Sequence, residues 1–282
     1  MEKWIITAET TCDLSAEIIR EKGFKIVPIT VILGTDMYRD GVDVTTEQLF
    51  DYVAKTGNLP KTSAVSVAEY QDFFNELKKE YDHVLHVALS SKASASCNNA
   101  ITAAQEIEGV CVIDSKALST GQGLLMLKAH DLLTDGMEFD DVCETIHEMV
   151  DRVQTSFIVD TLEYLAKGGR CSAVALVASK ILKIHPYIAE KDGQLTVKKK
   201  YMGTLQRSLS QYVTDLASEY HNYDKRRAFV THSPLDGRER VEEVIAKVKE
   251  LFDFDEIIET EAGSTVSTHC GKNTIGVLFI NE

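Results

Sequence analysis

The sequence predicts an α/β protein of two domains: an N-terminal three-layer α/β domain with a mainly parallel sheet (residues 1–153) and a C-terminal α/β domain with a mixed sheet (154–282). Three observations predict this fold. Short apolar runs alternate with amphipathic helical segments in the first half, which is typical of a parallel sheet covered by helices. The second half adds a hairpin signal, which indicates antiparallel pairing. The chain has 282 residues, 44% of them hydrophobic, and can therefore bury two cores.

The N-terminal elements follow from apolar spacing and end signals. We expect strands at 4–8, 24–33, 83–89 and 110–114, and helices at 15–23, 45–57, 66–80, 94–107, 119–134 and 139–152. Pro28 makes the second strand broken or an edge strand, because proline cannot donate to a strand ladder. Apolar residues from Val67 to Leu77 recur at helical spacing, so that helix should bury one face.

The C-terminal elements follow in the same way. We expect strands at 155–160, 227–232, 255–260 and 275–280, helices at 204–220 and 235–252, and a hairpin at 186–200. Asp192-Gly193 marks the hairpin turn. A helical turn from Leu162 to Lys167 should stop at Gly168-Gly169, because glycine allows a sharp redirection of the chain.

Charge and composition argue against several classes of protein. The chain carries 30 basic and 44 acidic side chains, a net charge of −14, which is not the electrostatic footprint of a nucleic-acid binder. Such a chain should also be repelled by anionic membranes, and no apolar run reaches the roughly 18 residues of a membrane helix. The six cysteines include no C-x-x-C pair, and the first residues lack a signal-peptide core. We therefore expect a cytoplasmic protein with no nucleic-acid partner and no stable membrane insertion.

Three loops should form a ligand crevice. In a parallel sheet, ligands bind beyond the carboxyl ends of the strands, and the loops 9–13, 90–96 and 115–123 lie there. All three are rich in serine and threonine, and the middle loop leads into a helix N-terminus, which favours an anion. Ser94 is placed there as a cap or as a ligand donor. Thr62 or Ser63, just before another predicted helix, has the same two possible roles.

Two further candidates have plain structural alternatives. Arg170 follows a helix end and could simply neutralise a surface carboxylate. His269 stands before Gly271 in a segment that reads as turn-like, and a lone histidine is more often structural than functional.

Several catalytic motifs are missing from the sequence. There is no phosphate-binding G-x-x-x-x-G-K-[ST] loop, no G-x-S-x-G elbow and no H-E-x-x-H zinc helix. His83 and His86 lie three apart in a strand, so they point to opposite faces and cannot share a metal.

A series of short motifs resembles one known family. The motifs are "AETTCDL" (8–14), "RDGVDVT" (39–45), "KTSAVS" (61–66), "SSKASASCNNA" (90–100), "VIDSKALSTGQG" (112–123), "LEYLAKGGRCS" (162–172), "KIHPYI" (183–188) and "THCGKNTIGVLF" (268–279). Their order and spacing resemble the DegV family of bacterial fatty-acid-binding proteins along essentially the whole chain. The "LEYLAKGGR" element is the most specific of them.

The resemblance implies a function and a set of site residues. Members of this family enclose one long-chain fatty acid between two α/β domains and present it to a separate ATP-dependent fatty acid kinase, which makes an acyl phosphate for phospholipid synthesis. The ligand-binding residues expected here are Thr62, Ser63, Ser94, Ala95, Arg170 and His269. No catalytic residue, metal or cofactor is expected.

The chain also departs from the family pattern. Ala8-Glu9-Thr10 stands where Thr-Asp-Ser is usual, and Met202, Thr204 and Leu205 stand where basic residues often form a cluster. The small residues Ala173, Ala175, Ala178 and Ser179 would either leave room beside a lipid tail or allow tight helix packing.

The leading hypothesis is a non-catalytic lipid-binding protein. A buried carboxylate needs hydrogen bonds and a nearby cation, and two hydroxyls, a helix N-terminus and Arg170 would supply them. Two alternatives remain open. The first is an enzyme acting alone on a small acyl or phosphoryl substrate with His269, Glu9 and Asp13. The second is an interaction protein that senses lipid.

Overall fold

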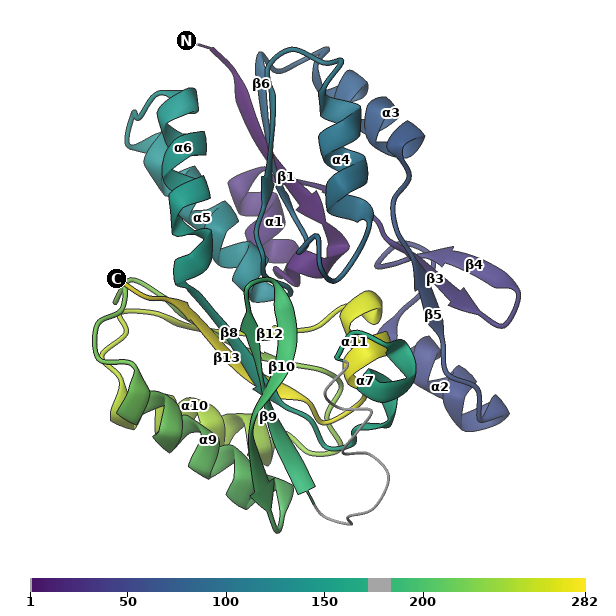
Figure 1. Ribbon diagram of the computed structural model, residues 1–282, viewed down its shortest axis with the longest axis vertical. Helices are drawn as coiled ribbons and strands as arrows, with labels where there is room; N and C mark the ends of the chain where they lie inside the picture. The colour runs from purple at the N-terminus through teal and green to yellow at the C-terminus, as the bar shows by residue number, and fades with distance from the viewer. Residues whose placement is uncertain (1, 172–183) are drawn as a thin grey trace.

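A computed structural model describes residues 2–171 and 184–282, and it confirms the two-domain α/β fold. Figure 1 shows the N-terminal domain above and the C-terminal domain below, joined where β8 (Val153–Ile158) enters the lower sheet. The small residues from Ala173 to Ser179 lie outside the described residues.

The N-terminal sheet is parallel, with the strand order β2-β1-β6-β7. Its strands are β1 (Trp4–Glu9), β2 (Lys25–Val27), β6 (His83–Ala88) and β7 (Val110–Asp114). Its helices are α1 (Ala16–Lys22), α3 (Val67–Leu77), α4 (Ser96–Ala104), α5 (Thr120–Thr134) and α6 (Phe139–Met149). The short helices η1 (Thr10–Cys12) and η2 (Val150–Arg152) follow β1 and α6.

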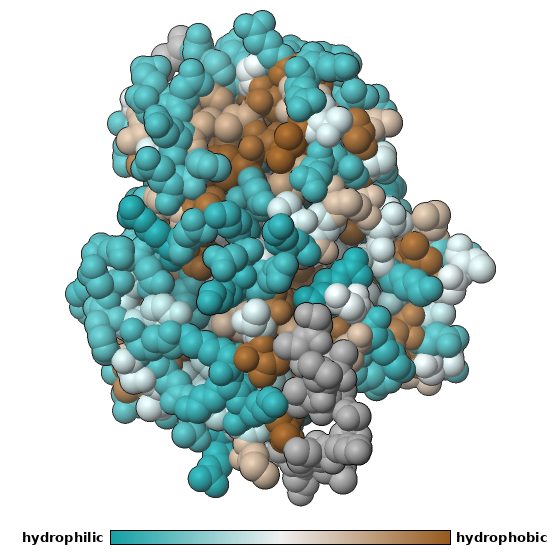
Figure 2. Space-filling view, viewed as in Figure 1, coloured by the Kyte–Doolittle hydropathy of each residue, from teal (hydrophilic) through white to brown (hydrophobic). Residues whose placement is uncertain are grey.

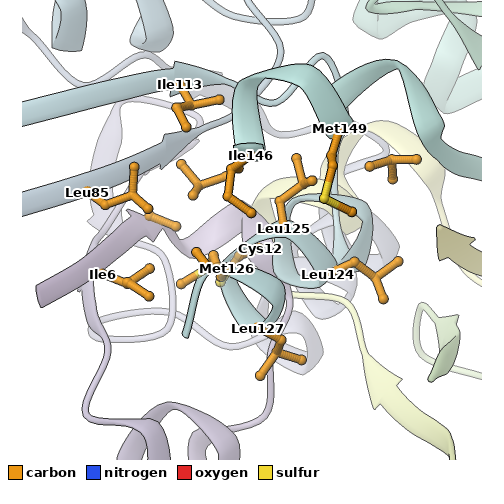
Figure 3. Packing of buried hydrophobic residues seen from close by; sticks show 14 of the residues in the cluster. Ile6, Cys12, Leu85, Ile113, Leu124, Leu125, Met126, Leu127, Ile146 and Met149 are labelled. Atoms are coloured by element: carbon orange, nitrogen blue, oxygen red, sulfur yellow. The ribbon is translucent and has the colours of Figure 1, made fainter. Parts of the chain in front are cut away.

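Two cores hold these layers together, one on each face of the parallel sheet. Helices α5 and α6 pack on one face, where Leu125 and Ile146 meet Ile6 and Leu85 of the strands (Figure 3). Helices α3 and α4 cover the other face, with Phe74 fully buried there. Burial on both faces explains why the strands read as continuous apolar runs.

A small antiparallel sheet, β4-β3-β5, branches from the N-terminal domain. Its strands are β3 (Thr30–Leu33), β4 (Asp36–Arg39) and β5 (Lys61–Ser63), and α2 (Thr46–Thr56) lies between β4 and β5 in the chain. The expected strand at 24–33 is therefore two strands in two different sheets. The break lies at Pro28, as its missing N–H predicts.

In the described residues, the C-terminal sheet has the order β10-β9-β8-β13-β11-β12. Its remaining strands are β9 (Ile184–Lys191), β10 (Gln194–Met202), β11 (Ala228–His232), β12 (Ile257–Glu261) and β13 (Ile275–Ile280). Only the β11–β12 pair is parallel among the described pairs of this sheet, so the expectation of a mixed sheet is confirmed. Helices α9 (Leu205–Glu219) and α10 (Glu239–Leu251) bury their apolar stripes against it.

The expectation of a turn-like segment around His269 is wrong. Residues Ser264–Cys270 form helix α11, which lies beside α7 (Glu163–Gly168) where the two domains meet (Figure 1). The local sequence, rich in serine and threonine, has weak helix propensity. Two carboxylates from distant parts of the chain bind the first N–H groups of α11, as described below.

The surface seen in Figure 2 is mostly hydrophilic, in keeping with the net charge of −14. Apolar atoms gather on the upper half of this face, which the N-terminal domain occupies. Within residues 2–171 and 184–282, none of the helices combines the length and hydrophobicity needed to cross a bilayer.

Candidate functional site

All six predicted ligand residues line one cavity of about 210 Å³. Thr62 and Ser63 come from β5, Ser94 and Ala95 from the loop before α4, Arg170 from the end of α7 and His269 from α11. The rest of the wall is largely apolar and comes from both domains, with Ile29, Leu89, Leu118, Leu165, Leu195 and Val266. The structure therefore brings these six residues together, while their role in binding stays a prediction.

Thr62 points its hydroxyl at α11. Its Oγ1 lies 2.9 Å from Nε2 of His269, so this pair links β5 to α11 across 207 residues of sequence. The capping role considered for Thr62 and Ser63 is wrong, because both lie in a strand. Ser66 caps α3 instead, in a capping box with Glu69.

Ser94 stands at the start of α4 without being its N-cap residue. Ala95 occupies the N-cap position and makes no side-chain cap bond. The Ser94 hydroxyl accepts a hydrogen bond from the Ser96 N–H at 3.2 Å and lies 3.0 Å from Ser96 Oγ. Ser96 Oγ in turn accepts from the Val65 N–H, so the two serine and threonine loops are tied together beside the cavity.

Arg170 is exposed, and its Nη1 donates to the Gly168 carbonyl at 2.7 Å. It makes no ion pair with a described residue, so the alternative of a surface charge neutralising a carboxylate gains no support. The two positions before Arg170 require glycine for different reasons. Gly169 adopts φ +70°, and a Cβ on Gly168 would lie 2.7 Å from Nδ1 of His269. The glycine pair thus lets α7 end against the histidine.

His269 is held in its neutral form at pH 7. Burial, and to a smaller extent the charge of Arg170, lower its pKa to about 4. Its Nδ1 is buried and has no hydrogen-bond partner among the described residues. When Nε2 carries the proton, it donates to Thr62 Oγ1, and the Thr62 hydroxyl is then free to donate to a ligand.

Two aspartates hold α11 in place, and reasoning from the sequence did not assign them this role. Asp40 accepts hydrogen bonds from the N–H groups of Ser264 and Thr265, both at 2.9 Å. Asp13 accepts from the Gly263 N–H at 2.8 Å and from the Ser119 hydroxyl at 2.5 Å. Burial raises the pKa of Asp13 to about 8 against these hydrogen bonds, and the nearby Asp40 charge adds to the rise. Both residues lie in quoted motifs, at 8–14 and 39–45.

Glu9 forms a second supporting network beneath the cavity. Its carboxylate is fully buried and accepts from the Tyr70 hydroxyl at 2.6 Å, the Gln122 amide at 2.7 Å and the Leu89 N–H at 2.9 Å. Burial alone would raise the pKa of Glu9, but His86 and the hydrogen bonds from Tyr70 and Leu89 lower it overall. Leu89 lines the cavity, so Glu9 positions the cavity wall.

The neutral histidine leads to a prediction about stability and pH. The unfolded state takes up a proton at His269 near pH 6.5, while the folded state does so only near pH 4. The unfolded state therefore binds more protons in this interval, and stability falls as the pH drops from 6.5 to 4, by up to about 3 kcal/mol from this residue. Below pH 4 the loss of stability that comes from His269 is complete and no longer changes with pH.

Urea unfolding of the wild type and His269→Gln between pH 4 and 7.5 measures this effect. The difference in unfolding free energy between the two proteins should change in that interval and level off above pH 7. Asp13 titrates in both proteins and cancels in the difference. A difference that stays flat with pH would contradict a neutral buried His269.

The described residues offer no cluster of three histidine, cysteine or acidic side chains that could hold a metal. His83 and His86 have separate partners, Glu2 for His83 and Thr7 for His86.

Comparison with known proteins gives one consistent result. A family pattern described as "Uncharacterised protein, DegV family" matches residues 3–282. A DegV domain-containing protein of Clostridium acetobutylicum is 29% identical over 286 residues, covering 100% of both chains. Another, from Caldanaerobacter subterraneus subsp. tengcongensis, is 28% identical over 282 residues and covers 99% of each.

Solved structures agree with this result. A fatty-acid-binding DegV family protein from Thermus thermophilus has a TM-score of 0.90 and 26% identity, covering 99% of this chain and 100% of its own. A stearic-acid-binding protein from Eubacterium ventriosum has a TM-score of 0.82 and 26% identity, covering 100% of this chain and 98% of its own. Because the family pattern spans nearly the whole chain, the protein belongs to the DegV family.

Proposed function

We propose that this protein binds a long-chain fatty acid in the cavity between its two domains, which we divide at residues 153 and 154. The observation that carries the proposal is the asymmetry of the cavity wall. Hydroxyl donors, a neutral histidine and an exposed arginine are grouped together, and the remaining wall is mainly aliphatic. Fatty acid binding by the Thermus thermophilus and Eubacterium ventriosum relatives supports the same ligand class.

The carboxylate would accept hydrogen bonds from Thr62 and Ser94. The cost of removing a carboxylate from water is offset when it is hydrogen-bonded and close to a cation, which here is Arg170. The aliphatic tail would replace water along the leucine and valine side chains. At roughly 0.8 kcal/mol per buried methylene, a 16-carbon tail contributes a gross stabilisation on the order of 10 kcal/mol.

We further propose that the protein presents the carboxylate to a separate ATP-dependent kinase in the cytoplasm and performs no chemistry alone. Arg170 supports this, because it lines the cavity and is also exposed to a partner. The alternative of an enzyme acting alone is less well supported, since Glu9 and Asp13 are buried and already accept several hydrogen bonds.

The fold explains why Thr204 and Leu205 stand at positions where basic residues are usual in the family. Thr204 caps α9 by accepting from the Arg207 N–H at 3.3 Å, and Leu205 is buried against the sheet. Both residues therefore serve the fold, and basic residues there would remove a cap or open the core. Met202 is 73% exposed and leaves an apolar contact on that surface.

Native mass spectrometry of purified protein tests the binding proposal. We expect an added mass equal to one fatty acid, retained from the expression host or taken up from added palmitate or oleate. A fatty alcohol of the same length, which has the tail without the carboxylate, should bind far more weakly. No adduct from either source would refute the proposal.

Arg170→Ala should separate binding from presentation. Arg170 is exposed, so its attraction to the carboxylate is screened and the affinity for oleate should fall by only about fivefold. Acyl-phosphate formation with an added kinase should fall by about 100-fold, because a cation there stabilises the charge of phosphoryl transfer. Isothermal titration and a radiolabelled phosphate assay measure the two effects.

Arg20→Ala, an exposed arginine on α1, is the matched control and should change neither quantity. Equal losses of binding and transfer in Arg170→Ala would show that Arg170 acts on binding alone.

A further inference from the structure

A second cavity, of about 200 Å³, adjoins the cavity that contains Thr62 and Ser94. The two cavities share four wall residues, which are Ala93, Leu118, Arg170 and Leu195. The second cavity is more polar than the first, because the charged side chains of Lys92, Lys116 and Glu190 also line it. A polar group attached to the head of a bound fatty acid would therefore have this second space beside it.

The fold places two lysines together at this cavity. Lys92 and Lys116 follow the carboxyl ends of β6 and β7, which pair in parallel. The Asp114 carboxylate ties the two loops together, because its Oδ1 accepts from the Ser91 N–H at 3.1 Å and from the Lys116 N–H at 3.0 Å. Lys116 adopts φ 50°, a left-handed conformation that is uncommon for a residue with a side chain, and the bond to Asp114 stabilises it.

The C-terminal domain closes the other side of the cavity. The tip of the β9–β10 hairpin reaches the N-terminal domain (Figure 1), where the Ser90 hydroxyl donates to the Gly193 carbonyl at 2.7 Å. A Cβ on Gly193 would lie 2.9 Å from Ser90 Oγ and 3.1 Å from Lys92 Cγ, so glycine permits this close approach. Glu190 accepts from the Gly193 N–H, and burial raises the pKa of Glu190 to about 7. This carboxyl therefore carries only part of a negative charge at neutral pH.

The cations around this cavity are available to an anion. Among residues 2–171 and 184–282, the side chains of Lys92 and Arg170 have no carboxylate partner. Lys116 pairs with Asp151 at 2.7 Å, but the two side chains are 38% and 68% exposed, so this pair contributes little. The Lys116 ammonium also keeps two further protons to donate. In a chain of net charge −14, three cations around one small space form a local exception to the overall field.

We propose that the second cavity binds the phosphate group of the acyl phosphate, so that the protein holds the product as well as the fatty acid. This inference rests on the function proposed above. In that reaction a carboxylate oxygen forms a bond to the γ-phosphorus of ATP, the bond from this phosphorus to ADP breaks, and ADP is the leaving group. The product carries a dianionic phosphate beside its carbonyl carbon, next to Arg170, which the two cavities share. Lysine and arginine donate strong, charge-assisted hydrogen bonds to phosphate oxygens.

A stable analogue of the product tests the inference. It is the β-ketophosphonate of palmitoyl phosphate, in which a methylene replaces the bridging oxygen, and calorimetry compares its binding with that of palmitate. The double variant Lys92→Ala, Lys116→Ala should bind the analogue at least about tenfold more weakly, because two charge-assisted hydrogen bonds are lost. Its affinity for palmitate should stay within about twofold of the wild type, since the carboxylate ends at Thr62 and Ser94.

The matched control is Lys55→Ala, Lys249→Ala, which removes two exposed positive charges from α2 and α10. It changes the net charge of the protein by the same amount and should bind both ligands like the wild type. An analogue affinity that Lys92→Ala, Lys116→Ala leaves unchanged, beside normal palmitate binding, would overturn the inference and leave the proposed function standing. A wild type that binds no palmitate would refute the proposed function and this inference with it.

Free inorganic phosphate distinguishes the product from the phosphate ion. The wild type should bind it far more weakly than the analogue, because burial of the tail contributes most of the affinity. Phosphate bound as tightly as the analogue would show a site for the free ion instead, and would overturn the inference.

Glu190→Gln should change the affinity in the opposite direction. Glu190 is the one acidic residue among the described residues that line this cavity, and glutamine keeps an acceptor for the Gly193 N–H. At pH 8, where the Glu190 carboxyl is mostly ionised, Glu190→Gln should bind the analogue about threefold more tightly and palmitate as the wild type does. Such a gain cannot come from misfolding. Weaker binding of the analogue by Glu190→Gln would contradict a phosphate group at this position.

Discussion

The double variant Thr62→Val, Ser94→Ala should lose nearly all affinity for long-chain fatty acids. Both hydroxyls line the cavity, and each would donate a hydrogen bond to the carboxylate. A hydrogen bond to a charged group contributes about 1.5–3 kcal/mol. Losing two of them should raise the dissociation constant for oleate by a factor on the order of 10² to 10⁴. Fluorescence competition or titration calorimetry with oleate measures the change.

The controls distinguish the loss of the two hydroxyl donors from a change in the shape of the cavity. Thr62→Ser keeps the hydroxyl beside Nε2 of His269 and should bind within a few-fold of the wild type. The double variant should lose little affinity for the fatty alcohol, whose head group carries no charge. Circular dichroism should show native helix content, because the Ser94 side chain accepts only one backbone hydrogen bond from the start of α4. Unchanged oleate affinity would place the carboxylate elsewhere.

Asp40→Ala should destabilise the protein by about 3–5 kcal/mol and abolish fatty acid binding. Asp40 is 2% exposed and accepts from two N–H groups in the first turn of α11. Alanine leaves both donors buried without a partner and removes a negative charge from the helix N-terminus. Because α11 carries Val266 and His269, the cavity wall should be lost with the helix.

Asp40→Asn keeps one acceptor oxygen and should retain about half of the lost stability. Chemical unfolding measures the free energy in each variant, and hydrogen exchange at the amides of α11 locates the loss. Exchange that increases evenly over the whole chain would contradict a local role for Asp40. Asp43→Ala, which removes an exposed carboxylate three residues away, should cost less than about 1 kcal/mol.

Much of the fold follows from local patterns. The helix from Val67 to Leu77 and the hairpin turn at Asp192-Gly193 lie where the spacing and the turn residues predict them. Such features depend on contacts within one or two helical turns or across one tight turn, which a single sequence displays directly. The break at Pro28 belongs to the same class, although the sequence does not show that the second piece joins another sheet.

For the candidate site, the sequence predicts the residues but not the contacts that they make. The motif order predicts Thr62, Ser94, Arg170 and His269 as site residues, and the rule that ligands bind beyond strand ends points to Ser94 alone among them. The sequence does not predict which of these residues contact each other, because the Thr62–His269 contact spans 207 residues.

The sequence by itself determined the α/β class, the alternating elements of the N-terminal domain and the residue types of the site. The tertiary structure alone decided that Ser264–Cys270 is a helix and that His269 is neutral. The physical reason is that helix caps and desolvation come from whatever packs nearby, here Asp40 from 224 residues earlier in the chain. Local helix propensity carries no information about a partner that reaches the helix only when the chain folds.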